Sequence, residues 1–253
     1  MKHKNYLFAV RSVIGNRTEQ QDCIGIVTGE KTFCVVVCDG MGGLKSGSSA
    51  STVAVETMSD IFKKINDDDI ISDILINSID ILDEAVFMLT DESGNRLESG
   101  TTIVSIVIRG DELFWMSVGD SRLYIIRNDE MVQATRDHNY ELYLNSVSET
   151  YTPTEKDIEM SQALISFIGM GGISIMDVSS NPVELIEKDV VLVASDGLYK
   201  ALSDNEIKDI IYANDDVEKA ADELLSVAEK NAPDTRDNTS FVLIKIDKGN
   251  SLE

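Results

Sequence analysis

Residues 32–43 read TFCVVVCDGMGG, and the rest of the chain is interpreted around them. The first seven positions are apolar or β-branched without polar alternation, which is typical of a strand buried on both faces. The run ends at Asp39 and a series of glycines, so a tight turn is expected to hold this carboxylate at the tip of the strand. Residues 190–198, VVLVASDGL, have the same arrangement around Asp196. The chain is therefore predicted to carry two aspartates at the ends of two buried strands.

Strand and helix patterns follow one another irregularly on either side of these runs. Short apolar runs predict strands at residues 5–11, 22–28, 32–38, 101–108, 113–118, 123–126, 131–134, 173–176, 183–186, 190–194 and 240–246. Helical spacing predicts helices at residues 46–65, 71–89, 204–212 and 217–231. Turn residues between neighbouring strands indicate hairpins, so the fold class is α+β with antiparallel sheets. No repeat or linker interrupts the pattern, and a single domain over residues 1–253 is the simplest interpretation.

Other polar features have structural interpretations at this stage. The second helix carries Asp73, Asp80 and Asp83 opposite its apolar stripe, and these carboxylates are expected to be solvated. Residues 139–162 have weak periodicity and are interpreted as a mobile insertion. His138 is expected to make a structural hydrogen bond.

Composition limits the classes of function. The chain has 253 residues, 43% of them hydrophobic, and a formal net charge of −23. This charge repels nucleic-acid phosphates and anionic membranes, so neither is an expected partner. No apolar run is long enough for a membrane span or a signal peptide, and a cytoplasmic protein is expected. Cys23, Cys34 and Cys38 are an odd number without CxxC spacing, so free thiols are expected.

Five aspartates stand at the end or edge of predicted strands. They are Asp22, Asp39, Asp120, Asp196 and Asp237. Carboxylates held near a core need cations or hydrogen bonds, because unpaired buried charges are costly. Hard divalent cations prefer such oxygen ligands. Any one Asp-Gly after a strand is more often a turn, so it is the repetition of the pattern that indicates a metal site.

The order of motifs along the chain is similar to that of a known family. The motifs are Arg17 with Gln21-Asp22, DGMGG at 39–43, SGTT at 99–102, VGDSRLY at 118–124, TRDH at 135–138, ASDGL at 194–198 and DNTS at 237–240. In this order they resemble the PPM family of metal-dependent Ser/Thr protein phosphatases, the type 2C enzymes, especially the bacterial branch. The resemblance covers nearly the whole chain. It implies an αββα sandwich of two antiparallel sheets flanked by helices.

The resemblance also implies a reaction and the residues that carry it out. Such enzymes hydrolyse phosphoserine and phosphothreonine in proteins by attack of a water that bridges two ions of Mn²⁺ or Mg²⁺. By matching position, Asp39 would bridge both ions and the carbonyl of Gly40 would bind one of them. Asp196 and Asp237 would hold the other ion.

Further roles follow from the same resemblance. Asp22 would orient a water on an ion without touching the ion, and Arg17 would bind the phosphate of the substrate. Asp120 would hold a third, weaker ion together with Asp196. The implied partner is a phosphoprotein, the target of a cognate Ser/Thr kinase, and the enzyme is expected to be a monomer. Residues 139–162 match a variable flap that influences substrate choice.

Four positions depart from the family pattern. Gln21 stands where the family usually has Glu, which lowers the negative charge beside Asp22. Met41 and Leu44 stand where other members have histidines, so protonation of the leaving group would rely on water. Ser166 stands where an Arg is usual. Activity is therefore expected, at a reduced level.

Two other functions compete with this one. The first is a catalytically silent relative that binds phosphoproteins or a regulator, and Gln21, Leu44 and Ser166 motivate it. The second is a doubly wound phosphohydrolase with an aspartate nucleophile, which requires a second Asp two positions after the first. Met41 occupies that position here and counts against it.

Overall fold

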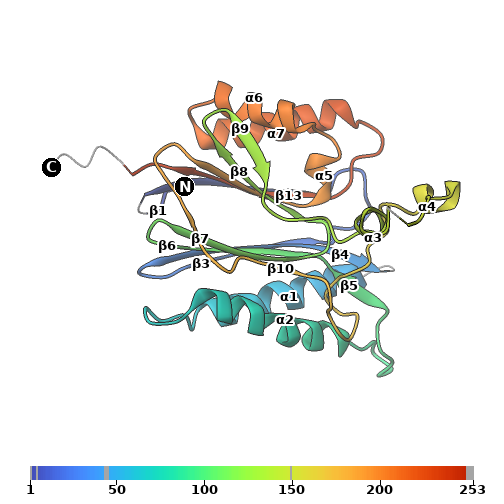
Figure 1. Cartoon of the computed structure of the whole chain (residues 1–253). Helices are drawn as coiled ribbons and strands as arrows, with labels where there is room; N and C mark the ends of the chain where they lie inside the picture. Colours follow the sequence, from blue (N-terminus) through green and yellow to red (C-terminus); the bar gives the residue numbers. More distant parts are fainter. Residues whose placement is uncertain (1, 4, 43–45, 149, 249–253) are drawn as a thin grey trace.

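The computed structural model describes residues 2–3, 5–42, 46–148 and 150–248. Two antiparallel sheets pack face to face, and helices cover the outer face of each, so the molecule has four layers (Figure 1). The predicted αββα sandwich is confirmed. Leu44, one of the departures from the family pattern, lies outside the described residues.

Both sheets are built from antiparallel pairs. The first has the order β1-β2-β13-β12-β8-β9, with bounds Lys2–His3, Tyr6–Val13, Thr239–Ile246, Val190–Ala194, Arg122–Arg127 and Glu130–Gln133. The second has the order β10-β7-β6-β4-β3, with bounds Asp177–Val178, Glu112–Val118, Ile103–Arg109, Thr32–Gly42 and Asp22–Thr28. Two short strands, β11 (Val183–Glu184) and β5 (Ser99–Thr101), pair with β7 and β4. Every strand pairing in the described ranges is antiparallel, which excludes the doubly wound alternative.

The strand β4 is buried on both faces, as its continuous apolar run predicts. Val35 and Val37 belong to the apolar cluster between the two sheets. Cys34 and Cys38 alternate with them and belong to the cluster between the second sheet and its helices. Together with Cys23 they are free cysteines, as expected. The alternation explains why no polar residue interrupts this strand before Asp39.

Helices cover each sheet with their apolar faces. The helices α1 (Ser46–Phe62) and α2 (Ile71–Phe87) lie on the sheet that contains β4. The helices α5 (Asp196–Tyr199), α6 (Asp204–Ala213) and α7 (Val217–Asn231) lie on the sheet that contains β12. Within the described ranges, none of the helices is long and apolar enough to cross a membrane.

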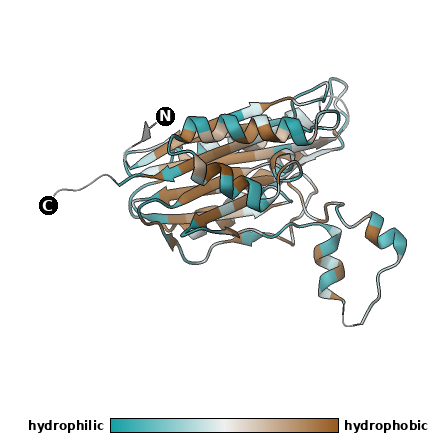
Figure 2. Ribbon diagram, turned by 90° about the horizontal axis from the view of Figure 1, so that it is seen from above, coloured by the Kyte–Doolittle hydropathy of each residue, from teal (hydrophilic) through white to brown (hydrophobic). Residues whose placement is uncertain are grey.

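The insertion at residues 139–162 contains two short helices, α3 (Tyr140–Ser146) and α4 (Glu155–Glu159), where the sequence predicted no regular structure. They project from the body of the sandwich (Figure 2). The Thr154 side chain accepts a hydrogen bond from the backbone N–H of Asp157, and the Asp157 carboxylate accepts one from the backbone N–H of Thr154. This capping box stabilises a helix start that hydrophobic periodicity does not reveal.

The strand predicted at residues 173–176 is wrong. Pairing with β7 begins only at Asp177, which stands opposite Ser117, and continues at Val178. In this register Met176 would stand opposite Val118, the last residue of β7, and residues 173–175 would lie beyond it. They have no neighbouring strand, so their alternating apolar pattern does not produce one.

The expectation that Asp83 is solvated is also wrong. Asp73 and Asp80 are exposed, but Asp83 is buried in α2. Its carboxylate accepts backbone N–H bonds from Gly169 at 2.7 Å and Gly172 at 2.6 Å. A loop from a distant part of the chain folds over this helix face, which the sequence of the helix alone cannot indicate.

Candidate active site

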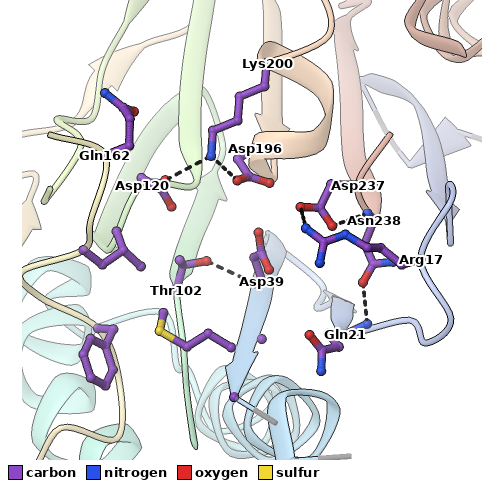
Figure 3. A pocket seen from close by; sticks show the side chains of 15 residues that line it. Arg17, Gln21, Asp39, Thr102, Asp120, Gln162, Asp196, Lys200, Asp237 and Asn238 are labelled. Carbon is purple, nitrogen blue, oxygen red and sulfur yellow. Dashed lines mark hydrogen bonds and ion pairs between the residues drawn. The ribbon is translucent and has the colours of Figure 1, made fainter. Parts of the chain in front are cut away.

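A cavity of about 470 Å³ opens at one end of the sandwich (Figure 3). The register of the strands places the end of β4, the end of β12 and the start of β13 there. Six of the seven predicted site residues line it: Arg17, Asp39, Gly40, Asp120, Asp196 and Asp237. The seventh, Asp22, lies behind the wall and pairs with Asp39 across β3 and β4.

Two threonines from a neighbouring segment hold the Asp39 backbone. The Asp39 N–H donates to Thr102 Oγ1 at 3.0 Å, and Thr101 Oγ1 donates to the Asp39 carbonyl at 2.9 Å. Gly40 follows in a space that only glycine can occupy, because a Cβ there would lie 2.1 Å from the carbonyl oxygen of Gly47. The carboxylate of Asp39 is therefore presented to the cavity by a backbone that has little freedom.

Burial and neighbouring carboxylates disfavour the charged form of Asp39. Burial raises its pKa well above the usual range, and the charges of Asp22 and Asp196 raise it further. The carboxylates of Asp39 and Asp196 lie beside each other on the cavity wall (Figure 3). Such a pair needs either a proton or a cation between its oxygens.

Asp22 is a buried carboxylate with one free oxygen. Its Oδ2 accepts from Ser195 Oγ at 2.8 Å, whereas its Oδ1 has no partner among the described residues. Burial raises the pKa of Asp22 to about 6, although hydrogen bonds from Ser195 and Ser240 oppose the shift. This arrangement leaves one buried acceptor oxygen that no described residue satisfies.

Asp196 and Asp237 flank adjacent strands of the first sheet, Asp196 after β12 and Asp237 before β13. Asp196 is the first residue of α5, and its Oδ1 is buried without a hydrogen bond in the described part of the chain. Gly197 allows the two segments to touch, because a Cβ there would lie 2.0 Å from the carbonyl oxygen of Asn238. Asp237 Oδ2 lies 2.5 Å from Arg17 Nη2.

Asp120 reaches the cavity from the turn that follows β7. Burial raises the pKa of Asp120, the charge of Asp196 adds to the rise and Lys200 opposes it. The resulting pKa is about 6. The backbone N–H of Gly119 donates to the ring Nδ1 of His138 at 3.1 Å, and the backbone N–H of His138 donates to the Gly119 carbonyl at 2.9 Å. His138 therefore makes the structural hydrogen bonds expected of it, and they hold the turn beside Asp120.

Two polar residues of the site were missed by the sequence analysis. Lys200 lies one helical turn after Asp196, and its ammonium is 2.5 Å from Asp196 Oδ2. Asn238 donates to the carbonyls of Ile14 at 2.8 Å and Glu19 at 3.0 Å, and so anchors the loop that carries Arg17. The i,i+4 spacing of Asp196 and Lys200 was a readable signal, whereas the contacts of Asn238 span more than 200 positions.

Gln21 and Ser166, two of the residues that depart from the family pattern, lie in different environments. Gln21 lines the cavity, and its side chain packs against Gly47. The Ser166 hydroxyl is buried and donates to the Ile175 carbonyl at 2.6 Å. Ser166 is not part of the cavity wall, so its effect on the site is indirect.

The donor set fits a hard divalent cation. Asp39 and Asp196 face each other, and unpartnered oxygens remain on Asp22 and Asp196. Oxygen-only sites of this kind suit Mg²⁺ and Mn²⁺. Among the described residues no three Asp, Glu, His or Cys side chains stand close enough to enclose an ion as they are. In Figure 3, Arg17 pairs with the carboxylate of Asp237 and Lys200 pairs with that of Asp196.

Comparison with known proteins agrees with this geometry. The sequence profile of the family described as "Protein phosphatase 2C" matches residues 11–237. The chain is 26% identical over 219 residues to the serine/threonine phosphatase stp of Listeria innocua, with 85% of each chain covered. It is 25% identical over 235 residues to protein phosphatase PhpP of Streptococcus pneumoniae, covering 92% of this chain and 94% of that protein.

Solved structures agree on the fold. The serine/threonine phosphatase of S. agalactiae superposes with a TM-score of 0.82 at 24% identity, covering 95% of this chain and 99% of that chain. The catalytic domain of the phosphatase PstP, solved in complex with two manganese ions, superposes with a TM-score of 0.71 at 23% identity, covering 95% of this chain and 97% of that chain. The family match spans most of the chain and includes every residue of the cavity wall except Asn238. The chain therefore belongs to the protein phosphatase 2C family of Ser/Thr protein phosphatases.

Proposed function

We propose that this phosphatase hydrolyses phosphoserine and phosphothreonine in proteins with the help of two Mn²⁺ or Mg²⁺ ions. The observation that carries the proposal is the convergence of Asp39, Asp196 and Asp237 on one cavity, with an arginine beside them. Bound ions would activate water for attack on phosphorus and neutralise charge on the phosphoryl oxygens. Substrates would be proteins phosphorylated by a Ser/Thr kinase.

Each carboxylate has a distinct place in this proposal. Asp39 would bind both ions, because it adjoins Gly40 in β4 and lines the same cavity as Asp196. The carbonyl of Gly40 would bind one ion, and Asp196 with Asp237 would bind the other. Asp22, whose Oδ1 has no protein partner in the described chain, would accept a hydrogen bond from a water in the site.

Arg17 is positioned to meet the phosphate of the substrate. Its side chain is 59% exposed at the cavity wall, so an incoming phosphate can reach the guanidinium. The planar guanidinium can donate two parallel hydrogen bonds to phosphate oxygens. None of the described residues that line the cavity is a histidine, so the leaving group would take its proton from water.

One observation favours a second candidate, a silent relative that binds phosphoproteins without hydrolysing them. Arg17 and Lys200 pair with Asp237 and Asp196, which are two of the residues that would hold ions. If both pairs excluded the ions, the cavity would keep an exposed arginine that can meet a phosphate but would lack the ions needed for hydrolysis. Phosphopeptide binding without metal-dependent turnover would identify this candidate.

The deciding experiment measures phosphate release from a phosphothreonine peptide with and without Mn²⁺. We expect turnover that requires the metal and that falls by a factor of about 10² or more in Asp39→Asn, because one metal-binding charge is lost. Asp80→Asn, at an exposed position on α2, is the matched control and should behave as wild type. Turnover that survives in Asp39→Asn would contradict the proposal.

A further inference from the structure

Lys200 projects a positive charge into the proposed ion-binding cavity. It follows α5 directly, and its ammonium lies 2.5 Å from Asp196 Oδ2 and 4.0 Å from Asp120 Oδ2 (Figure 3). The two carboxylates are 13% and 9% exposed as side chains, so both are largely removed from water. The buried carboxylates of Asp120 and Asp196 therefore both lie beside the ammonium of Lys200.

Contacts of the Lys200 backbone and of the preceding residue hold the backbone of Lys200 in place. Its backbone N–H donates to the Asp196 carbonyl at 2.9 Å. The preceding residue, Tyr199, donates its hydroxyl to the Asp120 carbonyl at 2.9 Å. The Arg122 guanidinium stacks on the Tyr199 ring at 3.6 Å from its centroid. These contacts tie the Lys200 segment to the Asp120 turn, so the ammonium is held near both acids.

Other charges near this pair are already engaged. Asp137, which also acts on Asp120, forms a bidentate pair with Arg122 at 2.9 and 2.6 Å. Arg17 lies on the opposite side of the cavity and pairs with Asp237. Among the described residues, Lys200 is thus the cation that contacts Asp120.

We propose that the Lys200 ammonium fills the place between Asp120 and Asp196, so that this phosphatase binds two ions and uses its own lysine as a tethered third cation. The inference rests on the proposed metal-dependent function and takes the place of the third ion that the family resemblance implied for Asp120. A tethered group competes at a high effective concentration, because it cannot diffuse away from the site. An additional ion would have to displace it from both carboxylates.

The test counts bound Mn²⁺ by equilibrium dialysis, up to millimolar free metal, in the full-length chain. Wild type should bind two ions. Lys200→Met keeps the length of the side chain but removes its charge, and it should bind a third ion within the same range of free metal, so that affinity at this place rises at least about tenfold. Adding Asp120→Asn to Lys200→Met should remove that third ion. Lys63→Met is the matched control, since this lysine pairs with Asp60 on the surface, and its count should equal that of wild type.

Three results would overturn the inference: three ions in wild type, two ions in Lys200→Met, or no bound ion in either protein. If Lys200→Met fails to fold, Asp120→Asn in the wild-type background tests the inference instead. This variant should bind two ions, as wild type does. A fall from three ions in wild type to two in the variant would refute the inference. Phosphate release is measured separately. A wild type that binds two ions without turnover would reject the proposed reaction, while the ion count would still decide the role of Lys200.

Discussion

The position of Asp39 depends on hydrogen bonds with two threonines at the end of β5. Thr101 and Thr102 bind its carbonyl and its N–H, and Thr102 Oγ1 is itself 2.6 Å from Ser121 Oγ. The charged side chain is thus held through its own backbone and not through its carboxylate. That leaves the carboxylate oxygens available for a ligand, which a hydrogen-bonded carboxylate would not offer.

At the same scale, Arg17→Ala should raise KM for a phosphopeptide by about 10- to 100-fold, because charge-assisted hydrogen bonds to the phosphate contribute about 1.5–3 kcal/mol. Mn²⁺ affinity should stay equal or increase, since Asp237 loses a competing partner. Steady-state kinetics and a metal titration check the two parts. Arg17→Lys, which keeps the charge without the planar fork, should be intermediate. An unchanged KM would remove Arg17 from the substrate site.

At the scale of elements, α2 anchors the loop at residues 168–172. Asp83 in α2 binds the backbone of Gly169 and Gly172, and the Ile168 backbone pairs with Thr101 in both directions. Thr101 in turn binds Asp39. A helix on the outer face of the sandwich is therefore connected to the site through one loop and one short strand.

This connection predicts that Asp83→Ala lowers the free energy of unfolding by about 2–3 kcal/mol, because buried N–H groups lose a charged acceptor. The exposed Asp80 on the same helix is the matched control, and Asp80→Ala should change stability by less than about 0.5 kcal/mol. Urea denaturation measures both variants. Equal stability of the two would show that the loop does not depend on Asp83.

At the scale of the whole molecule, the sandwich gathers acids from both sheets at one end. Asp22 and Asp39 come from one sheet, and Asp196 and Asp237 flank strands of the other. Packing the apolar faces of the two sheets together also forces these charges together. The folded chain therefore stores electrostatic repulsion that protons or cations relieve.

This repulsion predicts an unusual pH dependence in protein treated with EDTA. Burial raises the pKa of Asp22 and of Asp120 to about 6, above the usual value of about 3.9. Groups with raised pKa values stabilise the fold fully below about pH 4, and this stability is lost as pH rises through about 6. The melting temperature without metal should be lower at pH 7.5 than at pH 5, and each kcal/mol corresponds to about 2–4 °C.

Mn²⁺ should restore the melting temperature at pH 7.5, because ligands that bind only the folded state stabilise it. Scanning calorimetry at the two pH values, with and without Mn²⁺, gives the comparison. Asp22→Asn should reduce the difference between the two pH values, and Asp80→Asn should not. A melting temperature that does not respond to metal at pH 7.5 would argue against ions in the cluster.

Local sequence was sufficient for most strands and most helices. The unbroken apolar run before Asp39 predicted a doubly buried strand because hydrophobic burial follows periodicity, and β4 has that burial. The prediction at residues 173–176 was wrong because a strand also requires a free neighbouring edge, and β7 ends too early to provide one. The helices of the 139–162 insertion were missed because capping, not periodicity, marks their starts.

The sequence alone determined the antiparallel α+β class, the free thiols and the set of aspartates at strand ends, because all of these depend on nearest-neighbour patterns. Only the tertiary structure decided that Asp83 is buried, that Asn238 anchors the Arg17 loop and that Lys200 contacts Asp120. Each of these facts is a distance between segments that lie far apart in the chain or face one another only after folding. Such distances result from the packing of the two sheets and their helices, which no local pattern records.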